Sequence, residues 1–184
     1  MKKGEFKAED YTNDDMLYMG LNSALNSQLA VSYNQEQIKA LKAKGYTATS
    51  FITSDTVENQ INDLFGAVEL KFENEVTGCP SYKYYETDKL YLVNENCTNT
   101  QDKLAMMIDS SKFDGNTYKV VAYITLISNN KVFNDLNKST ALKTLENGEI
   151  FTIDASNKDK FATYTFTFNK NSDGKYQFIS AKKN

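Results

Sequence analysis

Three residue types on which many functional sites depend are missing from this chain of 184 residues. It contains no His and no Trp, and all 21 basic residues are Lys, so Arg is absent as well. His is the side chain that titrates closest to neutral pH. Its absence excludes Ser-His-Asp and Cys-His catalysis and also His-ligated zinc and haem sites. An enzyme made from this chain would have to use Asp, Glu, Tyr, Lys or Ser.

The missing Arg and the charge balance argue against nucleic-acid binding. Bidentate contacts to phosphate or guanine come from the Arg guanidinium group. The net charge of -3 also provides no field that would attract a polyanion. We therefore expect no nucleic-acid partner, and no residue pattern predicts a cofactor, a metal site or a catalytic set.

Long apolar runs are absent too. The longest is "VVAYITLI", from Val120 to Ile127, far shorter than the roughly 20 residues of a membrane helix. The start, "MKKGEFKAEDYTND", lacks the apolar region of a signal peptide. We expect no transmembrane segment in this chain. We interpret the polar start as a tether that follows a removed signal or lipid-anchor segment in the natural protein; a cytoplasmic protein is the alternative.

The first third of the chain has the period of helices. Leu17, Leu21, Leu25 and Leu29 form one stripe in residues 11–31, with Thr12 and Asp15 spaced as a capping box. A second helix is expected over residues 34–45. A third is expected over residues 54–66, capped through Asp55 and Glu58 and stopped by Gly66.

After Gly66 the apolar period changes to that of strands. Strands are expected over residues 67–72, 81–86, 89–95, 117–128, 149–154, 160–170 and 175–182. The nearly continuous apolar run in 117–128 predicts a central strand covered on both faces. Residues 103–109 fit either a strand or a short helix, and residues 129–148 suggest a short helix after a turn.

This order predicts an α+β fold in which N-terminal helices pack on one face of a curved, mostly antiparallel sheet. We interpret residues 1–184 as a single domain. Residues 1–11 are its tether, residues 12–52 its helical N-terminal part, and residues 53–184 its core of one helix and an antiparallel sheet.

The chain has only two cysteines, Cys79 and Cys97, and they flank a Tyr-rich segment. If the hairpin between them has a three-residue loop, Thr87 to Lys89, the two cysteines lie directly opposite each other. A two-residue loop misaligns them by one position. In the first register a disulfide is favoured, with about 3 kcal/mol of stabilisation from loop entropy and an extracytoplasmic location as its consequence. The alternatives are buried free thiols of a cytoplasmic protein, or a metal or redox role.

The Tyr-rich segment contains Tyr82, Tyr84, Tyr85 and Tyr91. Their alternation across a hairpin predicts cross-strand packing. The same residues are the candidate binding aromatics of the sequence, because Tyr gives a large contact area for a sugar or a peptide at low entropic cost.

Three stretches, "DTVENQINDLFG", "YKVVAYITLIS" and "KFATYTFTFNKNSDGKYQFISAKK", together resemble domains of uncharacterised lipoproteins from low-GC Gram-positive bacteria. Those domains look like members of the NTF2-like or cystatin-like α+β class. The resemblance covers roughly residues 53 to 184 and carries no catalytic residue to this chain.

The resemblance implies a non-enzymatic, extracytoplasmic domain of a secreted protein or lipoprotein. Such a domain would bind a cell-envelope, peptide or glycan partner and could be lipid-anchored in its full-length form. The alternatives are an NTF2-like small-molecule carrier or enzyme that uses Tyr and a carboxylate, and a cystatin-like protease inhibitor. An exposed aromatic patch is expected for the binding domain, and a buried carboxylate beside Tyr in an apolar pocket for the enzyme.

Overall fold

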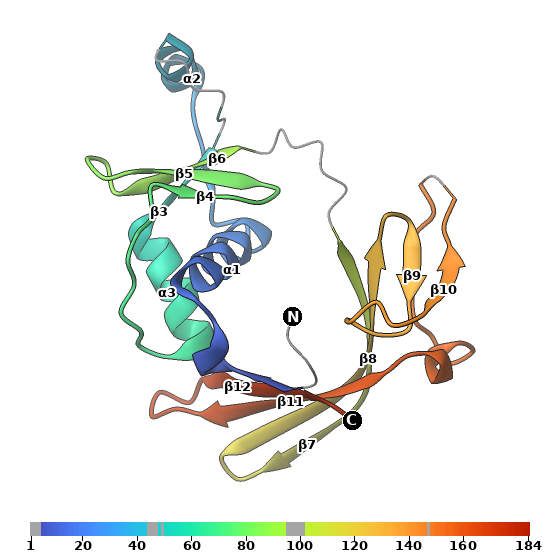
Figure 1. Cartoon of the computed structure of the whole chain (residues 1–184). Coiled ribbons are helices and arrows are strands. Elements are labelled where there is room, and N and C mark those ends of the chain that lie inside the picture. The colour runs from blue at the N-terminus through green and yellow to red at the C-terminus, as the bar shows by residue number, and fades with distance from the viewer. Residues whose placement is uncertain (1–4, 44–47, 49, 95–101, 147) are drawn as a thin grey trace. The chain divides into compact units, whose positions relative to one another are not determined.

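The structure is a computed structural model, and it describes residues 5–43, 48, 50–94, 102–146 and 148–184 (Figure 1). Within these residues, no helix is long and apolar enough to cross a membrane.

The chain forms two compact units. One consists of residues 11–99 and is called the helical unit below; the other combines residues 1–10 with residues 100–184 and is called the sheet unit.

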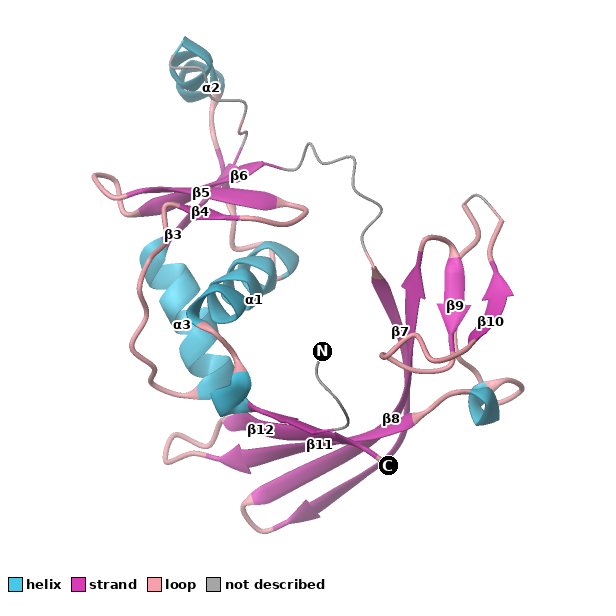
Figure 2. Ribbon diagram, in the orientation of Figure 1, coloured by secondary structure: helices cyan, strands magenta, loops and turns pink. Residues whose placement is uncertain are grey.

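The helical unit contains three α-helices and a small antiparallel sheet. The helices are α1 (Asn13–Asn26), α2 (Gln35–Ala43) and α3 (Ser54–Phe65), and the strands are β2 (Val31–Ser32), β3 (Ser50–Thr53), β4 (Glu75–Val76), β5 (Ser81–Tyr85) and β6 (Leu90–Asn94). The strand order is β2-β3-β6-β5-β4. Helices α1 and α3 lie together against this sheet (Figure 2), whereas no residue of α2 is buried.

The core of the helical unit comes from the faces that the apolar period predicted. Leu17 and Leu21 of α1 and Val57 and Ile61 of α3 have no exposed surface. Gly20 lets the two helices approach, because a Cβ atom at this position would lie 2.5 Å from Cγ1 of Ile61. The predicted stripe is shorter than expected, since α1 ends at Asn26 and Leu29 is exposed.

The structure confirms two predicted helix caps and corrects another. Thr12 and Asp15 form the predicted capping box at α1, and Gly66 ends α3 with a φ of 86°. The start of α3 was predicted wrongly, because its cap is Thr53, whose side chain accepts from the backbone N–H of Thr56.

The sheet unit is one antiparallel sheet. Its strands are β1 (Glu5–Lys7), β7 (Lys103–Asp114), β8 (Thr117–Ser128), β9 (Lys131–Phe133), β10 (Ala141–Thr144), β11 (Thr163–Lys170) and β12 (Tyr176–Lys183). The order is β1-β12-β11-β8-β9-β10, and β7 pairs with β8 as a long hairpin (Figure 1). Two 3₁₀ turns, η1 (Ala8–Asp10) and η2 (Lys158–Lys160), complete the unit.

Strand β8 is central, as its apolar run predicted. Tyr123 and Ile127 pack on the cluster around Val132, while Ala122 and Ile124 pack with Tyr164 in a second cluster. Since neighbouring residues of a strand point to opposite faces, both faces of β8 are covered here.

Two predicted elements, a helix in residues 129–148 and a strand over residues 67–72, do not form. In both segments a side chain forms hydrogen bonds with the backbone. The region 129–148 forms β9 and β10 instead of a helix, because the Asp135 side chain accepts from the loop N–H groups of Asn137 and Ser139. Residues 67–72 form no strand, because Asn13 binds both the N–H and the C=O of Lys71.

The structure also decides the conformation of two short segments, residues 149–154 and residues 103–109. Residues 149–154 have irregular backbone instead of the expected strand, and residues 103–109, which fitted a strand or a helix, belong to β7.

The predicted α+β class is confirmed, with helices packed against curved, antiparallel sheet, and at this coarse level it fits the NTF2-like class. The prediction of one domain over residues 1–184 stays a prediction. Two details differ from the expected plan: residues 5–7, assigned to a tether, form β1 on the edge of β12, and α3 belongs to the same compact unit as α1.

Candidate aromatic binding pocket

The four tyrosines that the sequence suggested as binding aromatics lie on β5 and β6, and they are buried or half-buried. Tyr82 is 1% exposed and Tyr91 has no exposed surface, while Tyr84 and Tyr85 are half-buried. The Tyr82 hydroxyl donates to the side chain of Asn22 at 2.9 Å. The predicted cross-strand packing is present, because Tyr84 lies directly opposite Tyr91 across β5 and β6 and their rings are in contact.

Three aromatic rings, those of Phe72, Tyr84 and Tyr91, pack against one another in this cluster. Phe72 stacks on Tyr84 with 5.4 Å between ring centroids, and Tyr84 lies 4.8 Å from Tyr91. The Tyr91 hydroxyl donates to the backbone carbonyl of Glu73 at 3.1 Å. Burial, and secondarily the neighbouring Tyr84, raise the pKa of Tyr91 well above its usual value of 10.0. These groups belong to the core of the helical unit, and a binding role for the four tyrosines stays a prediction.

The cysteine prediction depended on the register of the same hairpin. Strands β5 and β6 do pair, but Ser81 lies opposite Asn94 and Tyr85 opposite Leu90. This register differs by one residue from the one that placed Cys79 opposite Cys97. Cys97 lies outside the described residues, so the disulfide stays a prediction.

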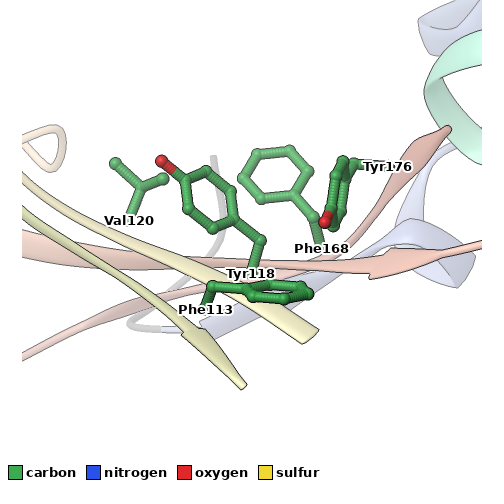
Figure 3. A pocket seen from close by; sticks show the side chains of 5 residues that line it. All are labelled: Phe113, Tyr118, Val120, Phe168 and Tyr176. Atoms are coloured by element: carbon green, nitrogen blue, oxygen red, sulfur yellow. The ribbon is translucent and has the colours of Figure 1, made fainter. Parts of the chain in front are cut away.

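The aromatic pocket of the structure lies in the sheet unit and was not predicted. It has a volume of about 420 Å³ and is lined by Phe113, Tyr118, Val120, Phe168 and Tyr176 (Figure 3). Four of these side chains are aromatic. They come from β7, β8, β11 and β12, so four strands contribute to one site.

Strand register brings these side chains to one face of the sheet. Phe113 lies opposite Tyr118 across β7 and β8, and Tyr118 lies opposite Phe168 across β8 and β11. Residues that lie directly opposite in neighbouring strands share a face. In Figure 3 the rings of Tyr118, Phe168 and Tyr176 stand on the same side of the strands.

Tyr176 meets Phe113 edge to face and Tyr118 at a tilted angle, which leaves an open pocket between the rings. Tyr176 lies 6.2 Å from Phe113 at an interplanar angle of 85°, and 5.7 Å from Tyr118 at 52°. Phe168 also contacts Phe178, which lies opposite it on β12, with 6.0 Å between their centroids. This geometry keeps ring faces available for a further apolar group.

The two hairpins that form the pocket are connected at their turns. The backbone N–H of Lys170 donates to the carbonyl of Asn116 at 2.7 Å, and the Thr117 hydroxyl donates to the side chain of Asn169 at 3.1 Å. Phe113 is 53% exposed and Tyr176 is 39% exposed, so a ligand can reach both rings. The pocket is therefore accessible and is held together by its own strands.

The chemistry of the pocket favours binding. None of its lining side chains carries a charge, and its only polar side-chain groups are the hydroxyls of Tyr118 and Tyr176. General acid–base catalysis at neutral pH needs a group with a suitable pKa within reach of the substrate. The pocket can bind apolar groups, and its own lining supplies no carboxylate or amine for such a step.

A buried carboxylate does occur in the sheet unit, at Asp135, whose side chain is 1% exposed. Burial alone would raise the pKa of Asp135. The Lys183 ammonium, 2.7 Å from Oδ2, and the hydrogen bonds from Ser139 outweigh it and lower the pKa to about 2.

These contacts give Asp135 a structural role. Its Oδ1 accepts from the backbone N–H groups of Asn137 and Ser139, and its Oδ2 accepts from the Ser139 hydroxyl and from Lys183. Tyr164 is close, since its hydroxyl accepts from the N–H of Leu136 at 3.3 Å. The carboxylate is ionised and its oxygens are occupied, so this pair does not match the general acid or base that the enzyme alternative requires.

A second, polar pocket of about 640 Å³ lies in the helical unit. It is lined by Thr12, Asn13, Asp14, Glu69, Leu70, Lys71 and Glu73. Much of this surface is committed to structure, because Thr12 caps α1 and Asn13 binds the backbone of Lys71. Among the residues that the structure describes, no group of three or more His, Cys, Asp or Glu could hold a metal ion.

Comparison with protein-family models, with curated proteins and with solved structures found no match.

The pocket residues left a weak signal in the sequence. Phe168 lies in a stretch of alternating aromatic residues, Tyr164, Phe166 and Phe168, which is typical of a strand with one apolar face. Asp114-Gly115 and Asp173-Gly174 mark two hairpin turns, which places aromatics on both sides of each turn. What the sequence does not contain is the pairing of β8 with β11, which brings the two hairpin ends together.

Proposed function

We propose that this chain is a non-enzymatic, extracytoplasmic binding domain of a secreted protein or lipoprotein, and that the aromatic pocket holds an apolar side chain of a peptide or protein partner. The observation that carries the proposal is the accessible pocket built by Phe113, Tyr118, Phe168 and Tyr176. The extracytoplasmic location rests on the sequence resemblance and on the predicted disulfide.

The lining favours a peptide over a glycan. A sugar presents hydroxyls that need hydrogen-bond partners when they are buried, and an unpaired buried polar group costs about 1–3 kcal/mol. Tyr118 and Tyr176 supply only one hydroxyl each. An aromatic or branched aliphatic side chain needs no such partner, and ring-to-ring contacts add about 0.5–1.5 kcal/mol beyond burial.

Saturation-transfer difference NMR with three small probes tests the proposal. The probes are N-acetyl-phenylalaninamide, N-acetyl-leucinamide and the disaccharide of N-acetylglucosamine. We expect saturation transfer to the ring protons of the phenylalanine probe, a weaker signal from the leucine probe, and none from the sugar. Tyr118→Ala should abolish the signal, because it removes the ring that faces both Phe168 and Tyr176.

Two control variants separate the pocket from general stickiness. Ile150 is 88% exposed and does not line the pocket, so Ile150→Ala should leave the signal unchanged. Tyr176→Phe keeps the ring and removes the hydroxyl, so it should also keep the signal. If only the sugar gave a signal, and if Tyr176→Phe lost that signal, the partner would be a glycan and not a peptide. No signal from any probe would reject the pocket as a binding site.

A further inference from the structure

Strand β7 presents an unusual outer edge. Among the residues that the structure describes, β8 is the only strand that pairs with β7. The other edge of β7 therefore offers backbone N–H and C=O groups to a further strand. Natural proteins usually protect such an edge, because a long, apolar, exposed edge strand promotes pairing with another chain.

The side chains of β7 add an apolar row to this edge. Leu104, Met106 and Ile108 are 57%, 58% and 59% exposed, although they are large and apolar. They alternate along the strand and so lie on one face. They are followed by a bulge between Ile108 and Ser110, which limits the regular part of the edge to the residues before it.

The opposite face of residues 103–109 carries a positive charge at one end and a negative charge at the other. Lys103 begins the strand, and Asp109 lies at the bulge. Lys158 lies 3.3 Å from Oδ1 of Asp109 and also over the ring of Tyr123, which is directly opposite Met107 in β8. The Asp109 carboxylate is thus held on the Met107 face of β7.

This charge pattern is complementary to itself. In an antiparallel pair of two β7 strands centred on Met106, Lys103 of each copy lies opposite Asp109 of the other. In the same register Leu104 lies opposite Ile108, and Met106 lies opposite its own counterpart. Both charge pairs are then attractive, and the exposed apolar rows of the two copies become neighbours. Opposite charges and apolar pairs across strands are stabilising, whereas like charges are destabilising.

We propose that β7 pairs with β7 of a second copy of this chain, in an antiparallel register centred on Met106, and so joins two sheet units into one continuous sheet. The interface is isologous, as expected for a two-fold symmetric dimer. Phe113 of the aromatic pocket lies beyond the paired segment, so the proposal does not depend on the proposed function.

Sedimentation equilibrium of the full chain, over a concentration series, tests the dimer. The apparent mass of the wild-type chain should rise from 20.8 kDa toward twice that value as the concentration increases. Met106→Lys places two ammonium groups at the symmetry axis and should raise the dimer dissociation constant by at least about tenfold, since like charges lie directly opposite. Leu142→Lys, at an exposed apolar residue of β10, is the matched control and should leave it unchanged.

A charge exchange tests the register. Lys103→Asp places two carboxylates opposite each other in both halves of the dimer, and Asp109→Lys places two ammonium groups there. Each variant alone should sediment as a monomer. An equimolar mixture of the two should recover the dimer, because every charge pair in the mixed dimer is again attractive.

Three results would overturn the proposal. The first is a wild-type chain that stays monomeric at all concentrations. The second is a dimer that Met106→Lys does not weaken, because the interface then lies elsewhere. The third is a mixture of the two charge variants that stays monomeric while each variant keeps the circular dichroism spectrum of the wild type, because the register is then wrong.

Discussion

The aromatic side chains of the helical unit and those of the sheet unit are packed in different ways. In the helical unit, Tyr82 and Tyr91 are buried and their hydroxyls are bound to Asn22 and to the backbone of Glu73. In the sheet unit, Phe113 and Tyr176 each lie beside the turn of a hairpin, and both are exposed. A Tyr-rich segment is therefore a poor guide to a binding surface when its hydroxyls have partners inside the fold.

The same contrast holds for aliphatic residues. Leu17 and Leu21 of α1 have no exposed surface, whereas Leu104, Met106 and Ile108 of β7 are more than half exposed. The buried leucines therefore stabilise the helical unit, whereas the exposed apolar residues of β7 in the sheet unit are accessible to a partner.

The largest effect is expected in the core of the helical unit. Leu21 has no exposed surface, and Leu21→Ala should lower the free energy of unfolding by about 2–5 kcal/mol through lost burial and a cavity. Leu104→Ala removes the same atoms from an exposed site and should cost less than about 0.5 kcal/mol. Urea unfolding of both variants, at a concentration where the chain is monomeric, measures the difference. Equal losses would contradict the contrast between the two regions.

The next effect concerns pH and the sheet unit. The pKa of Asp135 is lowered from 3.8 to about 2 in the folded chain. A lowered folded pKa means that the ionised carboxylate stabilises the fold above about pH 4, and that this stabilisation disappears as the pH falls toward about 2. The shift corresponds to about 2 kcal/mol.

Urea unfolding of Asp135→Asn at pH 6 and at pH 2 measures this contribution. The variant should be less stable than the wild type at pH 6, and the difference should shrink at pH 2. Asp114→Asn, at an exposed residue of β7, is the control and should follow the wild type. An unchanged difference at both pH values would show that the contribution of Asp135 is not electrostatic.

A smaller effect distinguishes the observed cap of α3 from the one that the sequence predicted. Thr53→Ala removes the side chain that accepts from Thr56 and should cost about 1 kcal/mol. Asp55→Ala removes the predicted cap and should cost much less. Thermal unfolding of the two variants decides between them, and a larger loss for Asp55→Ala would restore the original prediction.

The sequence predicted the parts of the fold that depend on local periodicity. The buried faces of α1 and α3, the stop at Gly66 and the extent of β8 follow from apolar spacing and from glycine at a positive φ. The failures arise where a side chain binds backbone from another part of the chain, as Asn13 does at Lys71, or within a loop, as Asp135 does.

The candidate site was harder to predict than the fold, because it depends on pairing between distant strands. Phe113 and Tyr118 are brought together by a local turn, but Phe168 and Tyr176 reach them only through the pairing of β11 with β8. Of the two hairpin registers that the sequence left open, the structure has the one that misaligns the cysteines by one position, with Tyr85 opposite Leu90 and a four-residue turn between them.

Nitration of the native chain with tetranitromethane, followed by peptide mass spectrometry, measures whether the tyrosines of the pocket are accessible while those of the helical unit are buried. The reagent attacks accessible tyrosines through the phenolate form. Tyr176 is accessible, whereas Tyr82 and Tyr91 are buried and the pKa of Tyr91 is raised by burial. We expect fast modification of Tyr176, protection of Tyr82 and Tyr91, and slower modification of Tyr176 when N-acetyl-phenylalaninamide is present. Modification of Tyr82 and Tyr91 at the rate of Tyr176 would contradict this expectation.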